Sequence, residues 1–129
     1  MNINKILESI KFDERGLIPA IIQDYKSKAV LTLCYMNRQA IEKTFEEGKV
    51  YVYRRSKGQL MMKGATSGCI QRVKSLCIDC EGNSFLFEVA QKRGACHEGY
   101  FTCYFRKADK DGNFKVVGKR IFDPCKVYK

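Results

Sequence analysis

The sequence predicts a single, mainly β domain with an α+β margin: a folded antiparallel or mixed sheet, or a partial barrel, with one helix near residues 37–47. Three observations lead to this expectation. The chain has 129 residues, the length of one domain with its own core. Short apolar or alternating segments recur along most of it, separated by turns rich in Gly, Asp and Asn. Only one stretch combines helical periodicity with signals at both of its ends.

The first half of the chain supplies two predicted strands and this helix. Ile18–Gln23 and Ala29–Met36 are largely apolar segments joined by a polar turn. Asn37 is a typical helix-capping residue, and the segment Arg38–Glu47 after it carries its apolar residues on one face. Gly48 is a typical helix terminator. We therefore expect a helix that begins after Asn37 and ends before Gly48.

The rest of the chain is predicted to form short strands and hairpins. The clearest turns are Glu81-Gly82-Asn83 and Asp109–Asn113. The opening segment 1–10 is predicted as a second, weaker helix. The basic segment 108–129 is expected to form a C-terminal hairpin or extension of the one domain that spans 1–129. The expected strands lie at residues 50–53, 59–62, 69–78, 84–90, 101–106 and 114–121.

The chain is basic, with 24 Lys and Arg against 14 Asp and Glu and a net charge of +10. The charge is spread along the chain, with concentrations at 54–57, 63, 72 and 115–129. We expect part of it to attract a small phosphorylated ligand. A basic nucleic-acid-binding domain with structural zinc is the alternative from another class. The sequence lacks the aromatic-basic stripes of RNA-binding sheets, so no nucleic-acid partner is expected.

No targeting or membrane segment is expected, and the predicted location is the cytoplasm. The N-terminus lacks the uninterrupted apolar run of a secretory signal, and the longest apolar runs are too short to cross a bilayer. Seven cysteines in a reducing compartment are expected to be thiols, each either a small buried side chain or a metal ligand. The buried-thiol interpretation is favoured for Cys34, Cys77 and Cys125.

Three cysteines are candidate metal ligands: Cys80, Cys96 and Cys103. The only histidine of the chain, His97, follows the middle one. Three thiolates can hold zinc and leave its fourth position open, as in catalytic zinc sites, and a neighbouring imidazole can move protons near neutral pH. Without a Cys-x-x-Cys pair, the spacing does not establish that the thiols converge, and unrelated buried thiols are an equal alternative. The ligands can also come from two chains.

Three further segments carry oxygen atoms or positive charge at turns. The turn Asp79–Asn83 has oxygen-bearing side chains at alternate positions, as hard-cation loops do. Asp109–Asn113 has a similar pattern, and there a plain hairpin turn is favoured. Lys63–Gly68 offers glycines, hydroxyls and a lysine to phosphate oxygens, with a flexible surface loop as an equal alternative. Arg54–Gly58 is a second candidate anion site, for which a solvated hairpin tip is the favoured alternative.

Taken together and in this order, these motifs resemble the phosphoribosyl-AMP cyclohydrolase family of histidine biosynthesis. The resemblance covers about residues 12–107. It implies a zinc-dependent hydrolase that opens the N1–C6 bond of the adenine ring of phosphoribosyl-AMP, the third step of the pathway. The matching text is Gly16–Asp24, Leu33–Asn37, Arg54–Lys57, Lys63–Gly68, Gln71–Val73, Asp79-Cys80, Gly94-Ala95-Cys96-His97 and Cys103–Arg106.

The resemblance also implies partners and roles. The family is a homodimer with shared zinc sites, which implies that Cys96 and Cys103 of one chain and Cys80 of the other bind zinc. Zinc can lower the pKa of a bound water to about 7, which yields a nucleophile at neutral pH. His97 is the expected catalytic residue for proton transfer at N1 or at the attacking water.

Magnesium and the substrate complete the expected ligands. The family's magnesium positions usually hold three aspartates, whereas this chain has Asp79, Glu81 and Asn83, so a weaker magnesium site is expected.

The alternative within the same class is a divergent zinc hydrolase or deaminase-like enzyme that acts on another nucleotide. The expected substrate-binding residues are Arg54, Ser56, Lys57, Lys63, Thr66, Ser67 and Gln71.

Overall fold

The computed structural model describes residues 2–128 and has a four-stranded mixed sheet at its centre. The strand order is β2-β1-β6-β5, with β1 and β6 parallel and the two outer pairs antiparallel. Strands β3 and β4 form one separate hairpin, and β7 and β8 form another. The strands are β1 (Ile18–Asp24), β2 (Val30–Met36), β3 (Tyr51–Arg54), β4 (Gln59–Met62), β5 (Gln71–Ile78), β6 (Phe85–Gln91), β7 (Arg106–Ala108) and β8 (Phe114–Val116).

The helices are α1 (Ile3–Ser9), α2 (Arg38–Glu47) and α3 (Pro124–Val127). The prediction for α2 is confirmed at both ends. The Asn37 side chain accepts a hydrogen bond from the Ala40 amide at 2.8 Å, and Gly48 ends the helix in the left-handed conformation (φ +71°). None of the helices in residues 2–128 has the length and apolar character needed to cross a membrane.

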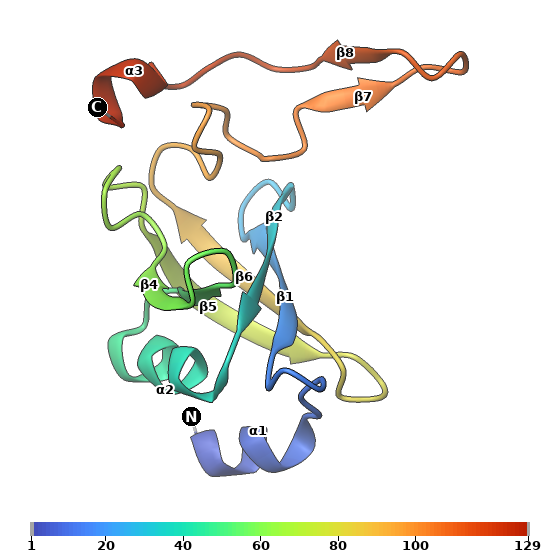
Figure 1. The fold of residues 1–129 in the computed structure, drawn as a ribbon. Helices are drawn as coiled ribbons and strands as arrows, with labels where there is room; N and C mark the ends of the chain where they lie inside the picture. Colours follow the sequence, from blue (N-terminus) through green and yellow to red (C-terminus); the bar gives the residue numbers. More distant parts are fainter. Residues whose placement is uncertain (1, 129) are drawn as a thin grey trace.

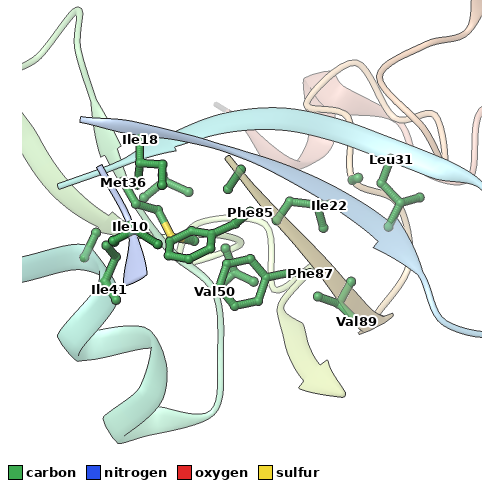
Figure 2. Packing of buried hydrophobic residues seen from close by; sticks show 14 residues of the cluster. Ile10, Ile18, Ile22, Leu31, Met36, Ile41, Val50, Phe85, Phe87 and Val89 are labelled. Atoms are coloured by element: carbon green, nitrogen blue, oxygen red, sulfur yellow. The ribbon is translucent and has the colours of Figure 1, made fainter. Parts of the chain in front are cut away.

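The hydrophobic core forms where the two parallel strands at the middle of the sheet meet α2 (Figure 2). Alternate residues of β1 and β6 are buried because successive side chains of a strand point to opposite faces. The Phe85 and Phe87 rings pack edge to face, 5.4 Å apart. Other buried residues of the cluster are Ile10, Ile18, Ala20, Ile22, Leu31, Met36, Ala40, Ile41, Val50, Val52, Val89 and Ala95.

A buried hydroxyl fixes the start of the β3–β4 hairpin against α2. Thr44 is fully buried, and its Oγ1 donates to the Ala40 carbonyl at 2.7 Å. The same Oγ1 accepts a hydrogen bond from the Tyr51 amide at 3.0 Å. Because Tyr51 is the first residue of β3, this hydroxyl determines where the hairpin leaves the core.

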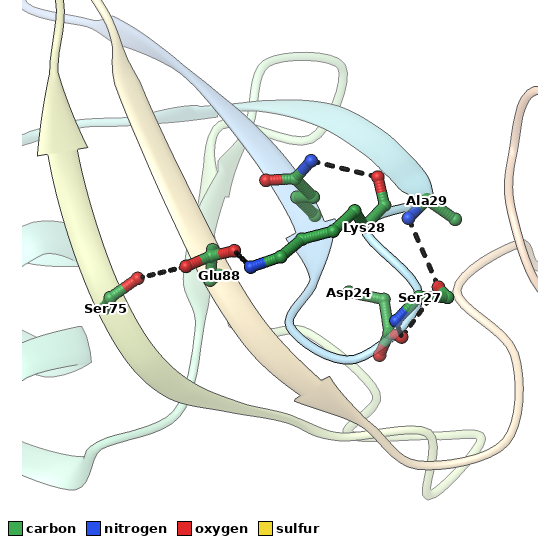
Figure 3. Close-up of polar contacts among 7 residues, drawn as sticks. Asp24, Ser27, Lys28, Ala29, Ser75 and Glu88 are labelled. Atoms are coloured by element: carbon green, nitrogen blue, oxygen red, sulfur yellow. Dashed lines mark hydrogen bonds and ion pairs between the residues drawn. The ribbon is translucent and has the colours of Figure 1, made fainter.

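Polar side chains connect neighbouring segments of the sheet at its surface (Figure 3). Glu88 on β6 forms an ion pair with Lys28 of the β1–β2 turn and accepts a hydrogen bond from the Ser75 hydroxyl on β5 at 2.9 Å. The bond from Lys28, followed by the bond from Ser75, lowers the pKa of the Glu88 carboxyl. Three neighbouring segments of the sheet are therefore joined through one carboxylate.

The expected mainly β domain is confirmed, and two of its strands differ from the expectation. The central pair is parallel, so the sheet is the mixed one of the expected alternatives, and within residues 2–128 it does not close into a barrel. Of the expected strand at 101–106 only Arg106 lies in a strand, as the first residue of β7, and the expected strand at 114–121 shortens to β8. Thr102 and Cys103 instead direct their hydrogen bonds to carbonyls at the start of β2, which keeps the segment before β7 in a loop.

The two ends of the molecule carry different segments, as Figure 1 shows. At one end lie α1 and the β5–β6 turn, where the Lys11 amide donates to the Gly82 carbonyl at 2.8 Å. At the other end lie the loop that follows β6, the β7–β8 hairpin and α3. The β5–β6 turn and the loop that follows β6 are therefore separated by the length of that strand.

We predict that Phe87→Ala lowers the free energy of unfolding by about 3–5 kcal/mol, because it leaves a cavity at the centre of the core. Urea denaturation measures the change. Phe114→Ala is the matched control, because Phe114 is 67% exposed, and its effect should stay within about 0.5 kcal/mol. Equal effects of the two substitutions would contradict the assignment of the core.

Candidate active site

A cavity of about 1220 Å³ lies between β2, the β3–β4 hairpin, the loop after β4, the loop after β6 and the C-terminal segment. It gathers most of the side chains that the sequence singled out. Because these segments are far apart in the sequence, the fold and not local spacing brings them together. The predicted site residues that line it are Arg54, Ser56, Lys57, Lys63, Thr66, Ser67, His97 and Cys103.

Positive charge dominates the wall of this cavity. In addition to the predicted cations it includes Arg15 and Arg55, and Glu98 is the only acidic side chain among the described residues that line it. The Arg55 guanidinium lies 3.9 Å from the centre of the Tyr35 ring, which holds it in a stacked position. Arg15 was not predicted as a site residue, because no motif surrounds it in the sequence. Arg55 lies within the predicted basic segment. Such a wall suits an anionic ligand.

The loop between β4 and β5 presents its hydroxyls from a compact turn. The Gly68 amide donates to the Gly64 carbonyl at 2.8 Å, and the Cys69 amide donates to Ser67 Oγ at 3.1 Å. Thr66 is exposed at the cavity, and Lys63 is half-buried at the start of the loop. These hydrogen bonds define the turn from which the loop presents its side chains to the cavity.

Gln71 stands apart from the other predicted substrate-binding residues. Its side chain is fully buried, and its Nε2 donates to Gln91 Oε1 at 2.7 Å. Gln91 Nε2 in turn donates to the Cys69 carbonyl at 3.0 Å. Gln71 is not among the residues that line the cavity, and it supports the end of the loop that does.

The loop after β6 holds the only histidine of the chain at the cavity. The Cys96 amide donates to the Tyr100 carbonyl at 3.1 Å, and the Gly99 amide donates to the Cys96 carbonyl at 3.0 Å, so residues 96–100 form a tight turn. Cys96 is 4% exposed, whereas the neighbouring His97 is exposed and lines the cavity. An imidazole in this position can exchange protons with a bound ligand.

Two of the three predicted zinc ligands are neighbours in one chain. The Cys103 amide donates to the Leu31 carbonyl at 2.7 Å, which docks this part of the loop on β2. Burial raises the pKa of the Cys96 thiol, and the adjacent Cys103 thiol raises it further. Cys34 belongs to the same neighbourhood: it is half-buried and lines the cavity, and desolvation raises its pKa to about 12, although Lys63 acts in the opposite direction.

Cys80, the third predicted ligand, lies at the opposite end of the sheet. It is exposed in the β5–β6 turn beside α1, whereas Cys96 and Cys103 follow the far end of β6. The seven residues of that strand span roughly 20 Å. Within residues 2–128 of one chain, no three His, Cys, Asp or Glu side chains come close enough to hold a metal. A single chain therefore does not bring the three thiols together.

The acidic turn around Cys80 is held by its own aspartate. Asp79 accepts hydrogen bonds from the Asn83 amide at 2.7 Å and from the Ser84 hydroxyl at 2.9 Å. The bond from the Asn83 amide is the main cause of the lowered pKa of the Asp79 carboxyl. Glu81 Oε2 accepts a bond of 3.5 Å from Asn83 Nδ2. The β7–β8 turn is built in the same way around Asp109, so these hydrogen bonds account for the shape of both turns without a cation.

Comparison with known proteins gives a consistent result over nearly the whole chain. Residues 32–105 match the family model described as "Phosphoribosyl-AMP cyclohydrolase". A protein of that name from Pelotomaculum thermopropionicum is 46% identical over 95% of both chains. Another, from Chlorobium limicola, is 44% identical over 95% of this chain and 89% of its own. The "Histidine biosynthesis bifunctional protein HisIE" of Thermoanaerobacter pseudethanolicus is 42% identical over 98% of this chain and 58% of its own.

The positive cavity wall leads to a binding prediction. Lys63→Met should weaken the binding of inorganic phosphate roughly tenfold, because a charge-assisted hydrogen bond is lost without replacement. Calorimetric titration at low salt measures the dissociation constant. Lys107→Met removes the same charge from the exposed strand β7, outside the cavity, and is the control. Equal weakening by both substitutions would mean that net charge, and not this site, attracts the anion.

Proposed function

Because the chain belongs to the phosphoribosyl-AMP cyclohydrolase family, we propose that it hydrolyses the N1–C6 bond of the adenine ring of phosphoribosyl-AMP in histidine biosynthesis. The observation that carries the proposal is 46% identity over 95% of both chains to a protein of that name. The cationic cavity with His97 on its wall supports it independently. Phosphoribosyl-AMP carries a phosphate at each of its two ribosyl ends, and both need positive charge or hydrogen-bond donors.

The cavity offers each part of this substrate a suitable surface. Arg54 and Lys57 belong to the β3–β4 hairpin, whereas Lys63 and Thr66 belong to the next loop, so the positive charge has two sources. A volume of about 1220 Å³ exceeds that of most small-ligand pockets, which leaves room for two ribosyl phosphates and a purine. We assign the phosphates to these two groups of residues.

Zinc is the proposed cofactor, bound by Cys80, Cys96 and Cys103. Thiolates are soft ligands that suit this ion, and Cys96 and Cys103 are already neighbours. Because Cys80 lies at the opposite end of the sheet, a second chain must supply it, so the proposed enzyme is a homodimer with shared sites. When bound, the ion supplies Lewis acidity that lowers the pKa of water at the site.

His97 is the proposed proton-transfer residue. Hydrolysis adds the hydroxyl of water to C6 and its proton to N1 as the C6–N1 bond breaks. The exposed imidazole lines the cavity directly after Cys96, so it can carry this proton from water to N1. The cations hold the phosphates and thereby orient the ring toward the imidazole.

Magnesium dependence stays a prediction. Both carboxylate oxygens of Asp79 accept hydrogen bonds within their own turn, and Glu81 and Asn83 are exposed. A neutral amide in place of a third carboxylate reduces the charge that a hard cation needs. These features support a weak magnesium site at most.

The function is tested by incubating the protein with phosphoribosyl-AMP and following the absorbance of the imidazole carboxamide product. We expect turnover that a zinc chelator abolishes and that added zinc restores. Cys96→Ser and Cys103→Ser should each reduce kcat/KM by at least about a hundredfold, because each removes a proposed metal ligand. Cys77→Ser, which alters an exposed thiol on β5, is the control and should keep the activity. Full activity of a folded Cys96→Ser variant would refute the zinc proposal, and no turnover of phosphoribosyl-AMP by the native protein would refute the function.

The shared site is tested by mixing two inactive variants. Cys80→Ser and Cys96→Ser proteins are unfolded together, refolded at equal concentrations and assayed. In each mixed dimer one site combines the intact Cys80 of one chain with the intact Cys96 and Cys103 of the other. Because random pairing makes half of the dimers mixed, about a quarter of the native activity should return. Cys96→Ser mixed with Cys103→Ser is the control and should remain inactive; absence of recovery in the first mixture would contradict a site shared between chains.

A further inference from the structure

We propose that residues 120–128, here called the C-terminal strap, form a wall of the substrate cavity and hold the loop that carries His97. The inference rests on the proposed function, because it assigns the strap a role in binding and converting the same substrate. The strap contains no motif, and only the fold places it beside the site. Figure 1 shows the strap, with α3, at the same end of the molecule as the loop after β6.

Hydrogen bonds attach the strap to the residues directly after His97. Arg120 Nε donates to the Glu98 carbonyl at 2.9 Å, and the Ile121 amide donates to the Gly99 carbonyl at 2.6 Å. The Arg120 guanidinium also lies 5.5 Å from the centre of the Tyr100 ring. Contacts to three successive residues of a tight turn restrain its backbone, and the orientation of the His97 side chain follows that backbone.

A close approach between Gly99 and Phe122 locks the strap in place. Gly99 has φ +94°, and a Cβ at this position would lie 2.1 Å from the Phe122 carbonyl oxygen. Phe122 is 7% exposed, and the Arg93 guanidinium lies 4.7 Å from the centre of its ring. A side chain at position 99 would therefore push the strap away from the loop.

Beyond this anchor the strap turns toward the cavity. Asp123 caps the short helix α3, with its Oδ1 accepting a hydrogen bond from the Cys125 amide at 3.0 Å. Pro124, Cys125 and Tyr128 line the cavity. These side chains are uncharged, in contrast to the cations of the β3–β4 hairpin and the next loop. Such a surface suits the purine and ribose parts of a nucleotide better than its phosphates.

The two roles of the strap, lining the cavity and restraining the loop that carries His97, predict different effects on KM and kcat. Tyr128→Ala removes an aromatic ring from the wall and should raise KM for phosphoribosyl-AMP roughly tenfold, with kcat within about threefold of the native value. Arg120→Met removes a restraint on the loop and should lower kcat about tenfold with a smaller change in KM, and Arg120→Lys should restore part of it. Val117→Ala, on the exposed segment before the strap, is the control and should change neither constant.

Gly99→Ala tests the contact between loop and strap, and Gly118→Ala is its matched control. Gly118 has φ +89°, but no atom lies within 4 Å of the place that a Cβ would occupy, so it shares the backbone strain without the collision. We expect Gly99→Ala to reduce kcat at least tenfold more than Gly118→Ala when both are assayed below their melting temperatures. If Gly99→Ala does not fold, the Arg120 variants decide the positioning role. Native kcat in both Gly99→Ala and Arg120→Met would overturn that role.

The rate at which Cys125 is alkylated tests whether the strap lines the ligand site, and it requires no enzymatic turnover. Trypsin releases it in the peptide Ile121–Lys126, which holds no other cysteine, so mass spectrometry can follow its alkylation by iodoacetamide. Saturating AMP should slow the reaction at Cys125 at least threefold and leave the exposed Cys77 on β5 unchanged. That result would support the wall even if phosphoribosyl-AMP were not a substrate. Equal rates at Cys125 with and without AMP, or a native KM in Tyr128→Ala, would overturn it.

Discussion

The parallel pairing of β1 with β6 is the constraint on which the rest of the molecule depends. Ala20 and Ile22 face the core from one strand, and Phe85 and Phe87 face it from the other, all at 1% exposure or less. Two strands in the same direction cannot be joined by a tight turn, so the chain between them must cross from one end of the sheet to the other. That connection runs through β2, α2, the β3–β4 hairpin, the loop 63–69 and β5. The structural requirement of the sheet thus supplies one side of the cavity.

Local signals predicted the elements that depend on local interactions. Asn37 and Gly48 act within their own turn, which is why both ends of α2 were predicted correctly. The parallel pair has no local signal, because its register depends on residues about sixty positions apart. The segment after Phe101 has the composition of a strand, yet the carbonyls of β2 take its donors, and sequence alone does not reveal that competition.

The same distinction applies to the candidate site. The short basic and hydroxyl-rich segments line the cavity because each is a compact loop whose exposed side chains are functional groups. Gln71 sits inside a matching stretch of sequence but is a buried neighbour of Gln91, a difference that depends on strand pairing. Tyr128 reaches the cavity only because Phe122 is anchored to a loop far from it in the sequence, so no motif around Tyr128 could predict its position.

The central parallel pair also has a consequence for the newly made chain. During synthesis β1 and β2 emerge early, whereas β6 follows about sixty residues later, a delay of several seconds at ordinary translation rates. Until then β1, including Ile22, pairs only with β2, and the edge of β1 that will face β6 has no partner strand. Pro19 limits this exposure, because it has no N–H to donate to a wrong partner strand. In the native sheet, β1 pairs with β6 only from Ala20 onward. The strand that organises the finished domain is therefore also the one most open to wrong partners while the chain is incomplete.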